Sequence, residues 1–143
     1  MPNHIILKNR IKNFNKKIIV SGDKSISIRW VLFSSIASGV SSASNLLMSE
    51  DVLTAINAIK KLGIKVSLKK NICKIYGKGI DGYNYKKNLS INSGNSGTLG
   101  RLILGLIINT PNSIKLIGDK SLSNRDFKRI SDPLSNFGAS FKL

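Results

Sequence analysis

The chain has 143 residues, of which 41% are hydrophobic and 6% aromatic, and this suffices for one ordinary domain with a sizeable core. Its 23 Lys and Arg residues against 7 Asp and Glu give a formal net charge of +16, which favours nucleic acid, an acidic membrane surface or anionic substrates as partners. No apolar run approaches the roughly 20 residues of a membrane-spanning helix and no secretory signal is visible, so we expect a cytoplasmic protein without a membrane segment.

Residues 17–20 are predicted to form a short strand that runs into a polar turn. Apolar residues then recur at helical spacing, which predicts a helix with its buried face at Ile28, Val31, Leu32 and Ile36. A second strand is expected over residues 43–47. The first segment therefore follows the order strand, helix, strand.

The clearest helix comes next. Ser49 is its expected N-cap, Asp51 suits its first turn, and Gly63 lies just beyond its end. The apolar stripe of this helix consists of Val52, Ala55, Ile56, Ile59 and Leu62. Two strands joined by a polar turn are then predicted at residues 64–68 and 72–76.

The same order of elements begins again in the second half of the chain. A strand at residues 89–91 leads into a polar loop, and a helix is predicted to follow. Aligning Arg29 with Arg101, 72 positions later, also pairs Gly22 with Gly94. A period of this length favours a duplicated α/β unit over a solenoid.

The second copy stops early. A helix is predicted around Phe127, Ile130, Leu134 and Phe137, and a last strand begins in residues 140–143. We therefore predict an α/β protein of repeated βαβαββ units, with one complete unit at about 17–82 and one incomplete unit at about 83–143. Residues 1–16 form a separate N-terminal segment.

Three polar loops stand at the ends of strands and mostly at the starts of helices: residues 22–25 with Arg29, residues 94–98 with Arg101, and residues 118–121 with Arg125. Glycine lets a backbone come close to a ligand, helix-start amides and hydroxyl groups donate to anionic oxygens, and Lys or Arg supplies full charge. One such loop alone is more typical of helix capping. Three loops of this kind in a repeated frame favour phosphate or carboxylate binding.

Other kinds of site fit the sequence poorly. Cys73 is the only cysteine and His4 the only histidine, which excludes an internal disulfide, a cysteine-rich zinc site and the usual base of a serine or cysteine nucleophile. The lysines occur in scattered pairs without a basic arm, and few aromatic residues stand near them to stack on bases. We therefore expect no metal and no nucleic-acid partner, and keep a basic nucleic-acid-binding domain as the alternative from a different class.

In their order and residues, the three loops resemble motifs of the family of 5-enolpyruvylshikimate-3-phosphate synthase, or 3-phosphoshikimate 1-carboxyvinyltransferase. The resemblance rests on Gly-Asp-Lys-Ser-Ile-Ser-Ile-Arg at 22–29, Gly-Asn-Ser-Gly-Thr at 94–98 and Gly-Asp-Lys-Ser-Leu at 118–122, and Phe-Gly-Ala at 137–139 extends it. It implies a fold of the enolpyruvyl transferase type, of which this chain is the amino-terminal third.

The resemblance also implies an activity in aromatic amino-acid synthesis. The enolpyruvyl group of phosphoenolpyruvate is transferred to the 5-hydroxyl of shikimate 3-phosphate with release of phosphate, and no cofactor or metal is needed. Lys24 would contact both substrates and take part in catalysis, and Ser25 and Arg29 would bind shikimate 3-phosphate. Gly97 and Arg125 would bind phosphoenolpyruvate. The same pocket would also be lined by Asn95, Asp51, Thr98 and Arg101.

The same resemblance implies that part of the active site is missing from this chain. We expect the C-terminal remainder of the same enzyme to be the partner that supplies the other wall and most of the groups that move protons. Residues 1–16 are expected to pack with that second domain. The chain alone is therefore expected to be inactive.

The chain departs from the usual motifs at several positions. Asp126-Phe127 stands where the family usually has Pro-Met, Leu99-Gly100 where a small residue and methionine are preferred, and Ile28 where histidine or asparagine is common. Asp126 is expected to neutralise Arg125 in part. The sister enzyme that acts on a nucleotide sugar is the alternative within the superfamily, but it typically has Lys-Asn where this chain has Lys24-Ser25.

Overall fold

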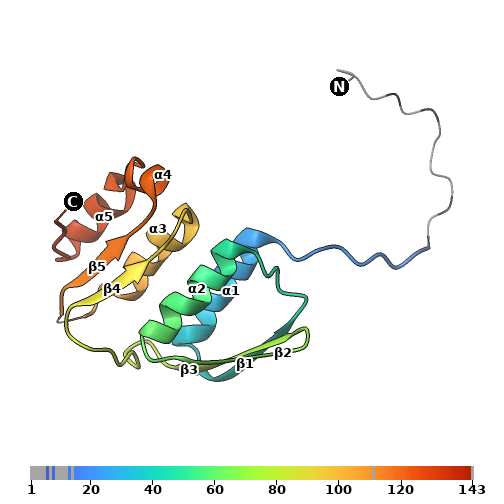
Figure 1. The fold of residues 1–143 in the computed structure, drawn as a ribbon, viewed down its shortest axis with the longest axis horizontal. Helices are drawn as coiled ribbons and strands as arrows, with labels where there is room; N and C mark the ends of the chain where they lie inside the picture. The colour runs from blue at the N-terminus through green and yellow to red at the C-terminus, as the bar shows by residue number, and fades with distance from the viewer. Residues whose placement is uncertain (1–5, 7, 9–12, 14, 111, 143) are drawn as a thin grey trace.

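The protein folds into two neighbouring α/β layers that share one core, as the ribbon in Figure 1 shows. The computed structural model describes residues 6, 8, 13, 15–110 and 112–142. Most of the predicted N-terminal segment 1–16 lies outside these residues. None of the helices in the described part is long and apolar enough to span a bilayer.

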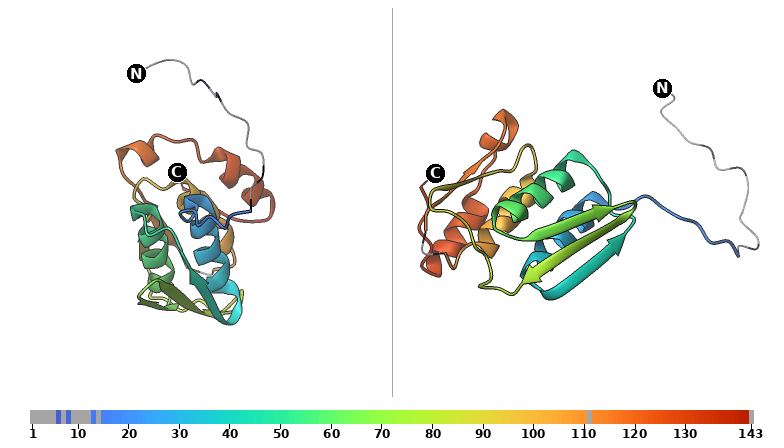
Figure 2. Two further views of the ribbon diagram at one scale, coloured as in Figure 1. Left: turned by 90° about the vertical axis from the view of Figure 1, so that its right-hand side faces the viewer. Right: turned by 60° about the horizontal axis from the view of Figure 1, so that its bottom comes forward.

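The first layer contains two helices and one antiparallel sheet. Helix α1 spans Lys24–Ile36 and α2 spans Glu50–Lys61. The strands are β1 (Ser38–Ser44), β2 (Lys65–Lys69) and β3 (Ile72–Lys78), in the order β1-β3-β2. Both helices cover the same face of this sheet (Figure 2). The prediction of two helices and a β2–β3 hairpin in this region is confirmed.

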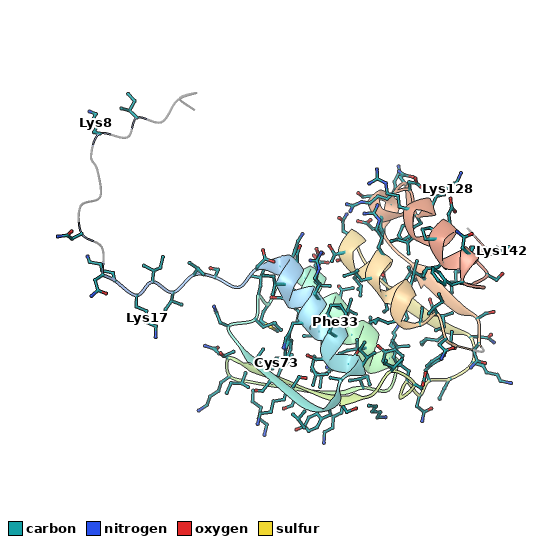
Figure 3. All side chains as sticks on the ribbon, turned by 180° about the vertical axis from the view of Figure 1, so that it is seen from behind. Lys8, Lys17, Phe33, Cys73, Lys128 and Lys142 are labelled. Atoms are coloured by element: carbon teal, nitrogen blue, oxygen red, sulfur yellow. The ribbon has the colours of Figure 1, made fainter. Side chains whose placement is uncertain are left out.

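The core lies between α1, α2 and the sheet and continues to α3. Every second residue of β3 points inward, and Cys73 and Ile75 are buried on that side; Figure 3 shows Cys73 between sheet and helices. The apolar stripe predicted for α2 is buried, including Ile56 and Ile59. Burying side chains of this size stabilises the fold by about 1.5–3 kcal/mol each relative to exposure.

Gly63 ends α2 in the way its position predicts. Its φ of +86° lies in the left-handed region, which glycine adopts without strain. A Cβ at this position would also collide with the carbonyl oxygen of Asn84. The turn after α2 therefore requires glycine twice over, by its backbone conformation and by the close approach of the neighbouring chain.

The second layer places the candidate site. Strands β4 (Leu89–Asn92) and β5 (Ile114–Ile117) pair in parallel, with α3 (Gly97–Leu106) between them in the chain. Two helices follow, α4 (Lys120–Ser123) and α5 (Lys128–Asn136). Because β4 and β5 are parallel, the loops that leave them emerge at the same edge of the sheet.

The predicted strand at residues 17–20 is not formed. The chain is extended there but pairs with no strand in the described part, and Ile18, Ile19 and Val20 are largely exposed. Asn45 Nδ2 donates a hydrogen bond to the Val20 carbonyl at 2.9 Å. An apolar segment with a preference for β structure forms a strand only beside a neighbouring strand. A single side-chain hydrogen bond does not replace the backbone hydrogen bonds of strand pairing.

Two other strand predictions were wrong. Residues 140–142 of the predicted last strand form no strand and have no pairing partner among the described residues. The strand expected over residues 43–47 is β1, which begins at Ser38 and ends at Ser44. Its serine-rich sequence lacks the apolar pattern of a strand, and pairing along the whole of β3, from Ser38 opposite Lys78 to Ser44 opposite Ile72, overrides that weak propensity.

Candidate functional site

Two of the three polar loops are joined directly. The Ser93 amide, after β4, donates to the Ile117 carbonyl at 2.8 Å, and the Asp119 amide, after β5, donates to the Gly94 carbonyl at 2.9 Å. These bonds continue the β4–β5 pairing beyond the strand ends. The loop after β4 and the loop after β5 therefore form one unit.

A chain of hydrogen bonds crosses from one of these loops to the other. Arg125 Nη2 donates to Asn95 Oδ1 at 3.2 Å, and Asn95 Nδ2 donates to Asp119 Oδ2 at 2.6 Å. The second carboxylate oxygen of Asp119 accepts from the Leu122 amide at 2.7 Å, which makes Asp119 the N-cap of α4. Asp119, fixed as the cap of α4, thus holds the Asn95 side-chain amide, and Asn95 in turn orients the Arg125 guanidinium.

These contacts also act on the protonation of Asp119. The hydrogen bond from the Leu122 backbone amide, then the one from Asn95, lowers the pKa of this carboxyl below its ordinary value of 3.8, and the charge of Arg125 adds to the effect. Asp119 therefore remains a carboxylate at neutral pH, and an ionised acceptor strengthens the bond that holds Asn95.

Gly97 lies directly beneath the Arg125 guanidinium. It is the first residue of α3, whose N-cap is Ser96. A Cβ built on Gly97 would lie 2.6 Å from Arg125 Nη1, so only glycine leaves room for the guanidinium at this point. A cation next to free amides at the start of a helix attracts an anionic oxygen. Thr98, the next residue, is partly buried in the same first turn.

A second group of predicted residues lies at the start of α1. Asp23 caps this helix by accepting from the Ile26 amide at 2.7 Å. Lys24 Nζ lies 3.1 Å from Asp51 Oδ2, with Asp51 22% exposed and Lys24 54% exposed. On the same helix, Arg29 Nη1 donates to the Ser25 carbonyl at 3.1 Å. The N-terminal turns of α1 and α2 therefore carry four of the predicted residues: Lys24, Ser25, Arg29 and Asp51.

The two groups lie at one end of the molecule without touching. Figure 1 shows the starts of α1, α2 and α3 at the same end of the three helices, and α1 packs against both α2 and α3. A Cβ on Gly94 would lie 3.8 Å from Thr54 Oγ1, so the loop after β4 also reaches α2. No hydrogen bond or ion pair among the described residues joins Lys24 or Asp51 to Arg125 or Asn95. The Lys24–Asp51 pair and the Arg125–Asn95 pair are therefore separate in the free chain.

Some features of the site were missed by the sequence analysis. Asp126 does not pair with Arg125, because its carboxylate accepts from the Lys128 amide at 2.7 Å at the start of α5. Asp119 belongs to the third polar loop, but its role in orienting Asn95 was not predicted. The contact of Arg101 with the Asp126 carbonyl, 3.3 Å from Nη2, was also not predicted, since the sequence offers no signal that brings residues so far apart together.

Comparison with known proteins assigns this arrangement to a family. The family model of EPSP synthase (3-phosphoshikimate 1-carboxyvinyltransferase) matches residues 8–143. The 3-phosphoshikimate 1-carboxyvinyltransferases of Bacillus cytotoxicus and of a Sulfurihydrogenibium species are 44% and 40% identical to this chain over 130 residues, which cover 91% of the chain and 30% of each relative. The EPSP synthase structure from Acinetobacter baumannii superposes with a TM-score of 0.82 at 33% identity, over 90% of this chain and 29% of that one.

The chain spans about 30% of the length of the curated relatives it matches. Within that span the match includes all three polar loops and both cationic groups at the helix starts, since the family model extends from residue 8 to residue 143. The chain belongs to the EPSP synthase family.

Proposed function

We propose that this chain supplies one wall of the active site of an enzyme that transfers the enolpyruvyl group of phosphoenolpyruvate to the 5-hydroxyl of shikimate 3-phosphate, with release of phosphate. The observation that carries the proposal is the Arg125 guanidinium held over Gly97 by Asn95, in a chain of the EPSP synthase family. Both substrates carry several negative charges, so bringing them together requires fixed cations and backbone donors.

Phosphoenolpyruvate is assigned to the start of α3. There the Arg125 guanidinium, the first-turn amides and the Thr98 hydroxyl offer donors to a phosphate or carboxylate group. The pairing of Arg125 with Asn95 leaves the rest of its donor fork free for a ligand, since Arg125 forms no ion pair in the described part. Arg101, whose guanidinium approaches the same helix start, adds a second positive charge.

Shikimate 3-phosphate is assigned to the start of α1. Lys24, Ser25 and Arg29 all lie on the first two turns of that helix. The free backbone N–H groups at a helix N-terminus attract a phosphate. In the free chain Asp51 holds the Lys24 ammonium at 3.1 Å. Because Lys24 is half exposed, its flexible side chain is able to turn toward a ligand bound between the two groups, and we propose that it contacts both substrates.

The other wall of the site is proposed to come from the part of the relatives that this chain does not span. We propose that residues 1–16 pack with that part, and that residues 17–82 and 83–143 belong to two successive units of the substrate-binding domain. The apolar side chains of Ile18, Ile19 and Val20, directly after residues 1–16, lack cover in the described structure, which supports a further part that packs at this end of the chain. A cytoplasmic location remains a prediction.

The catalytic part of the proposal predicts that this chain alone is inactive. Asp119 and Asp23 cap helices and Asp51 pairs with Lys24, so these three carboxylates near the site are already engaged within the chain. A cleft with one wall also leaves water around the substrates, where cations attract them only weakly. The rate of phosphate release from the two substrates should equal the background rate. Turnover by the chain alone at an ordinary enzyme rate would show that the catalytic groups lie within this chain.

Titration of the ¹⁵N-labelled chain tests the binding part of the proposal. Phosphoenolpyruvate should shift the amide signals of Gly97 and Thr98, and shikimate 3-phosphate those of Ser25 and Arg29. A nucleotide sugar, the substrate class of the alternative transferase, should shift neither set. Binding of the nucleotide sugar at α1 in place of shikimate 3-phosphate would overturn the assignment, and sequence-specific binding of duplex DNA that survives high salt would favour the nucleic-acid alternative.

A further inference from the structure

Two positions that depart from the usual family motifs are in contact with each other. Gly100 is buried on α3, and a Cβ built there would lie 3.3 Å from Cζ and 3.5 Å from Cε1 of Phe127. The ring of Phe127 therefore rests on the backbone of α3, and a methyl group on residue 100 would push it away. The glycine and the phenylalanine form a matched pair, here named the Gly100–Phe127 contact.

The residue after Gly100 is held by this same contact. Arg101 Cζ lies 5.8 Å from the centroid of the Phe127 ring, and Arg101 Nη2 donates to the Asp126 carbonyl at 3.3 Å. Within the described part of the chain no carboxylate pairs with Arg101, and its buried Nε has no hydrogen-bond partner. Packing against the ring and one carbonyl bond thus set the orientation of this guanidinium.

That orientation brings two arginines to one point. From the position that a Cβ on Gly97 would occupy, Arg125 Nη1 is 2.6 Å away and Arg101 Nη1 is 3.8 Å away. Two guanidinium groups repel each other, so contacts within the free chain must hold them: Asn95 binds one, and the Phe127 ring and the Asp126 carbonyl hold the other. An anionic group beside Gly97 would relieve that repulsion.

We propose that Phe127 is a positioning residue of the anion site. Seated on Gly100, its ring holds the Arg101 guanidinium beside Gly97, so that a phosphate or carboxylate group at the start of α3 meets two cations instead of one. The inference rests on the proposed function, because the anion is the one that phosphoenolpyruvate supplies. It names Phe127 and Gly100 as residues that tune affinity for this anion without touching it.

The first experiment measures the position of Arg101 without ligand. The Nε–H signal of Arg101 in the ¹⁵N-labelled chain should be displaced by the ring current of Phe127. Phe127→Leu keeps an apolar side chain but removes the ring, so the signal should move toward its ring-free position. Phe137→Leu is the matched control, since Phe137 is 85% exposed. An Arg101 signal that is the same in Phe127→Leu and in the unmodified chain would overturn the inference.

The second experiment measures affinity with phosphoenolpyruvate and with inorganic phosphate as probes. Phe127→Leu should raise the dissociation constant of both by about two- to fivefold, the range expected when a cation–π contact is lost at a partly exposed site. Phe137→Leu should bind as the unmodified chain does, and Gly100→Ala, which displaces the ring, should weaken binding in the same direction as Phe127→Leu. A purely structural role for the ring would change the melting temperature but not the affinity of the folded chain.

The outcomes separate the inference from the proposed function. If the unmodified chain binds the probes beside Gly97 and Phe127→Leu binds them equally well, the positioning role is wrong and the proposed function stands. If the unmodified chain binds neither probe, both the anion site and the role of Phe127 are overturned. Weaker binding by Phe127→Leu and by Gly100→Ala, with unchanged binding by Phe137→Leu, supports the proposal.

Discussion

The two halves of the chain differ in how they bury their helices. In the first half α2 buries Val52, Ala55, Ile56, Ala58 and Ile59 against α1 and the sheet. In the second half α5 buries only Ser131, carries Pro133 in its interior and ends beside the exposed Phe137. Stability is therefore concentrated in the first half. The two arginines beside Gly97 belong to the second half, where hydrogen bonds and the Phe127 ring hold their guanidinium groups.

This difference explains how each half contributes to the proposed site. Lys24 and Asp51 stand on the first turns of two well-packed helices, so their backbone positions are set by the core. Arg125 follows the short helix α4 and depends on Asn95 and Asp119 for its orientation. Changes in the core of the first half should alter folding most, and changes in the contacts around Arg125 should alter binding more than folding.

The largest expected effect tests the first half of the comparison. Ile56→Ala removes a side chain that is 1% exposed in the core and should lower the free energy of unfolding by about 2–5 kcal/mol. Phe137→Ala, at the end of α5, should change it by less than about 0.5 kcal/mol. Urea denaturation followed by circular dichroism measures both. An equal loss of unfolding free energy in the two variants would show that α5 contributes as much to stability as the core of the first half.

The next effect concerns the two cationic groups. Arg125→Ala should weaken phosphoenolpyruvate binding by about 1.5–3 kcal/mol, the usual worth of a charge-assisted hydrogen bond, and should affect shikimate 3-phosphate less. Lys24→Ala should weaken the binding of both substrates, because the Lys24 ammonium is proposed to contact both. Arg129→Ala, which removes the same charge at an exposed position on α5, is the control. Equal losses for the two substrates in Arg125→Ala would contradict the role assigned to Arg125.

A smaller effect is expected from Gly97→Ala. The new methyl group meets Arg125 Nη1, the mobile end of a long side chain, so the guanidinium should shift rather than the helix. We expect phosphoenolpyruvate affinity to fall by about 1 kcal/mol, because the shifted guanidinium weakens its hydrogen bond to the ligand without abolishing it, and stability should be nearly unchanged. Gly105→Ala is the control, because a Cβ there meets nothing within 4 Å. Isothermal titration compares the two; an unaffected affinity in Gly97→Ala would mean that Arg125 does not bind the ligand from above Gly97.

The smallest effect is a pH dependence of the Asp119 cap. Because the pKa of Asp119 is lowered in the folded chain, its carboxylate stabilises the fold at pH values above the ordinary value of 3.8, and this contribution is lost as the pH falls through the folded-state pKa. Asp119→Ala should therefore lower the melting temperature at pH 7 and lose that difference in acid. A difference that persists unchanged at pH 2.5 would show that the charge of Asp119 is not what stabilises the cap.

The elements with a strong local pattern could be predicted from the sequence. The apolar period of α2, the hairpin of β2 and β3, and the glycine after α2 all depend on residues close together in the chain, and each is found where expected. The three polar loops were also recognisable, because glycine, hydroxyl and cation recur at one spacing. Family membership followed from those loops and is confirmed by the match over residues 8–143.

Pairing between distant segments could not be predicted in this way. The run at 17–20 has the composition of a strand, yet it has no neighbour to pair with in the described structure, while the serine-rich β1 becomes a strand because β3 lies beside it. Strand formation is decided by partners far along the chain, and local composition reports only a tendency.

The sequence by itself determined the residue types that are proposed to recognise anions, their loops and the family to which the chain belongs. Only the tertiary structure decided which of these residues meet: Arg125 over Gly97, Asn95 between Arg125 and Asp119, and Phe127 on Gly100. The physical reason is that side-chain hydrogen bonds and ring contacts act over a few ångströms, whereas Asn95 and Arg125 are 30 positions apart in the chain. Parallel pairing of β4 and β5 brings their two loops to one edge of the sheet, and from there the short-range contacts form the site.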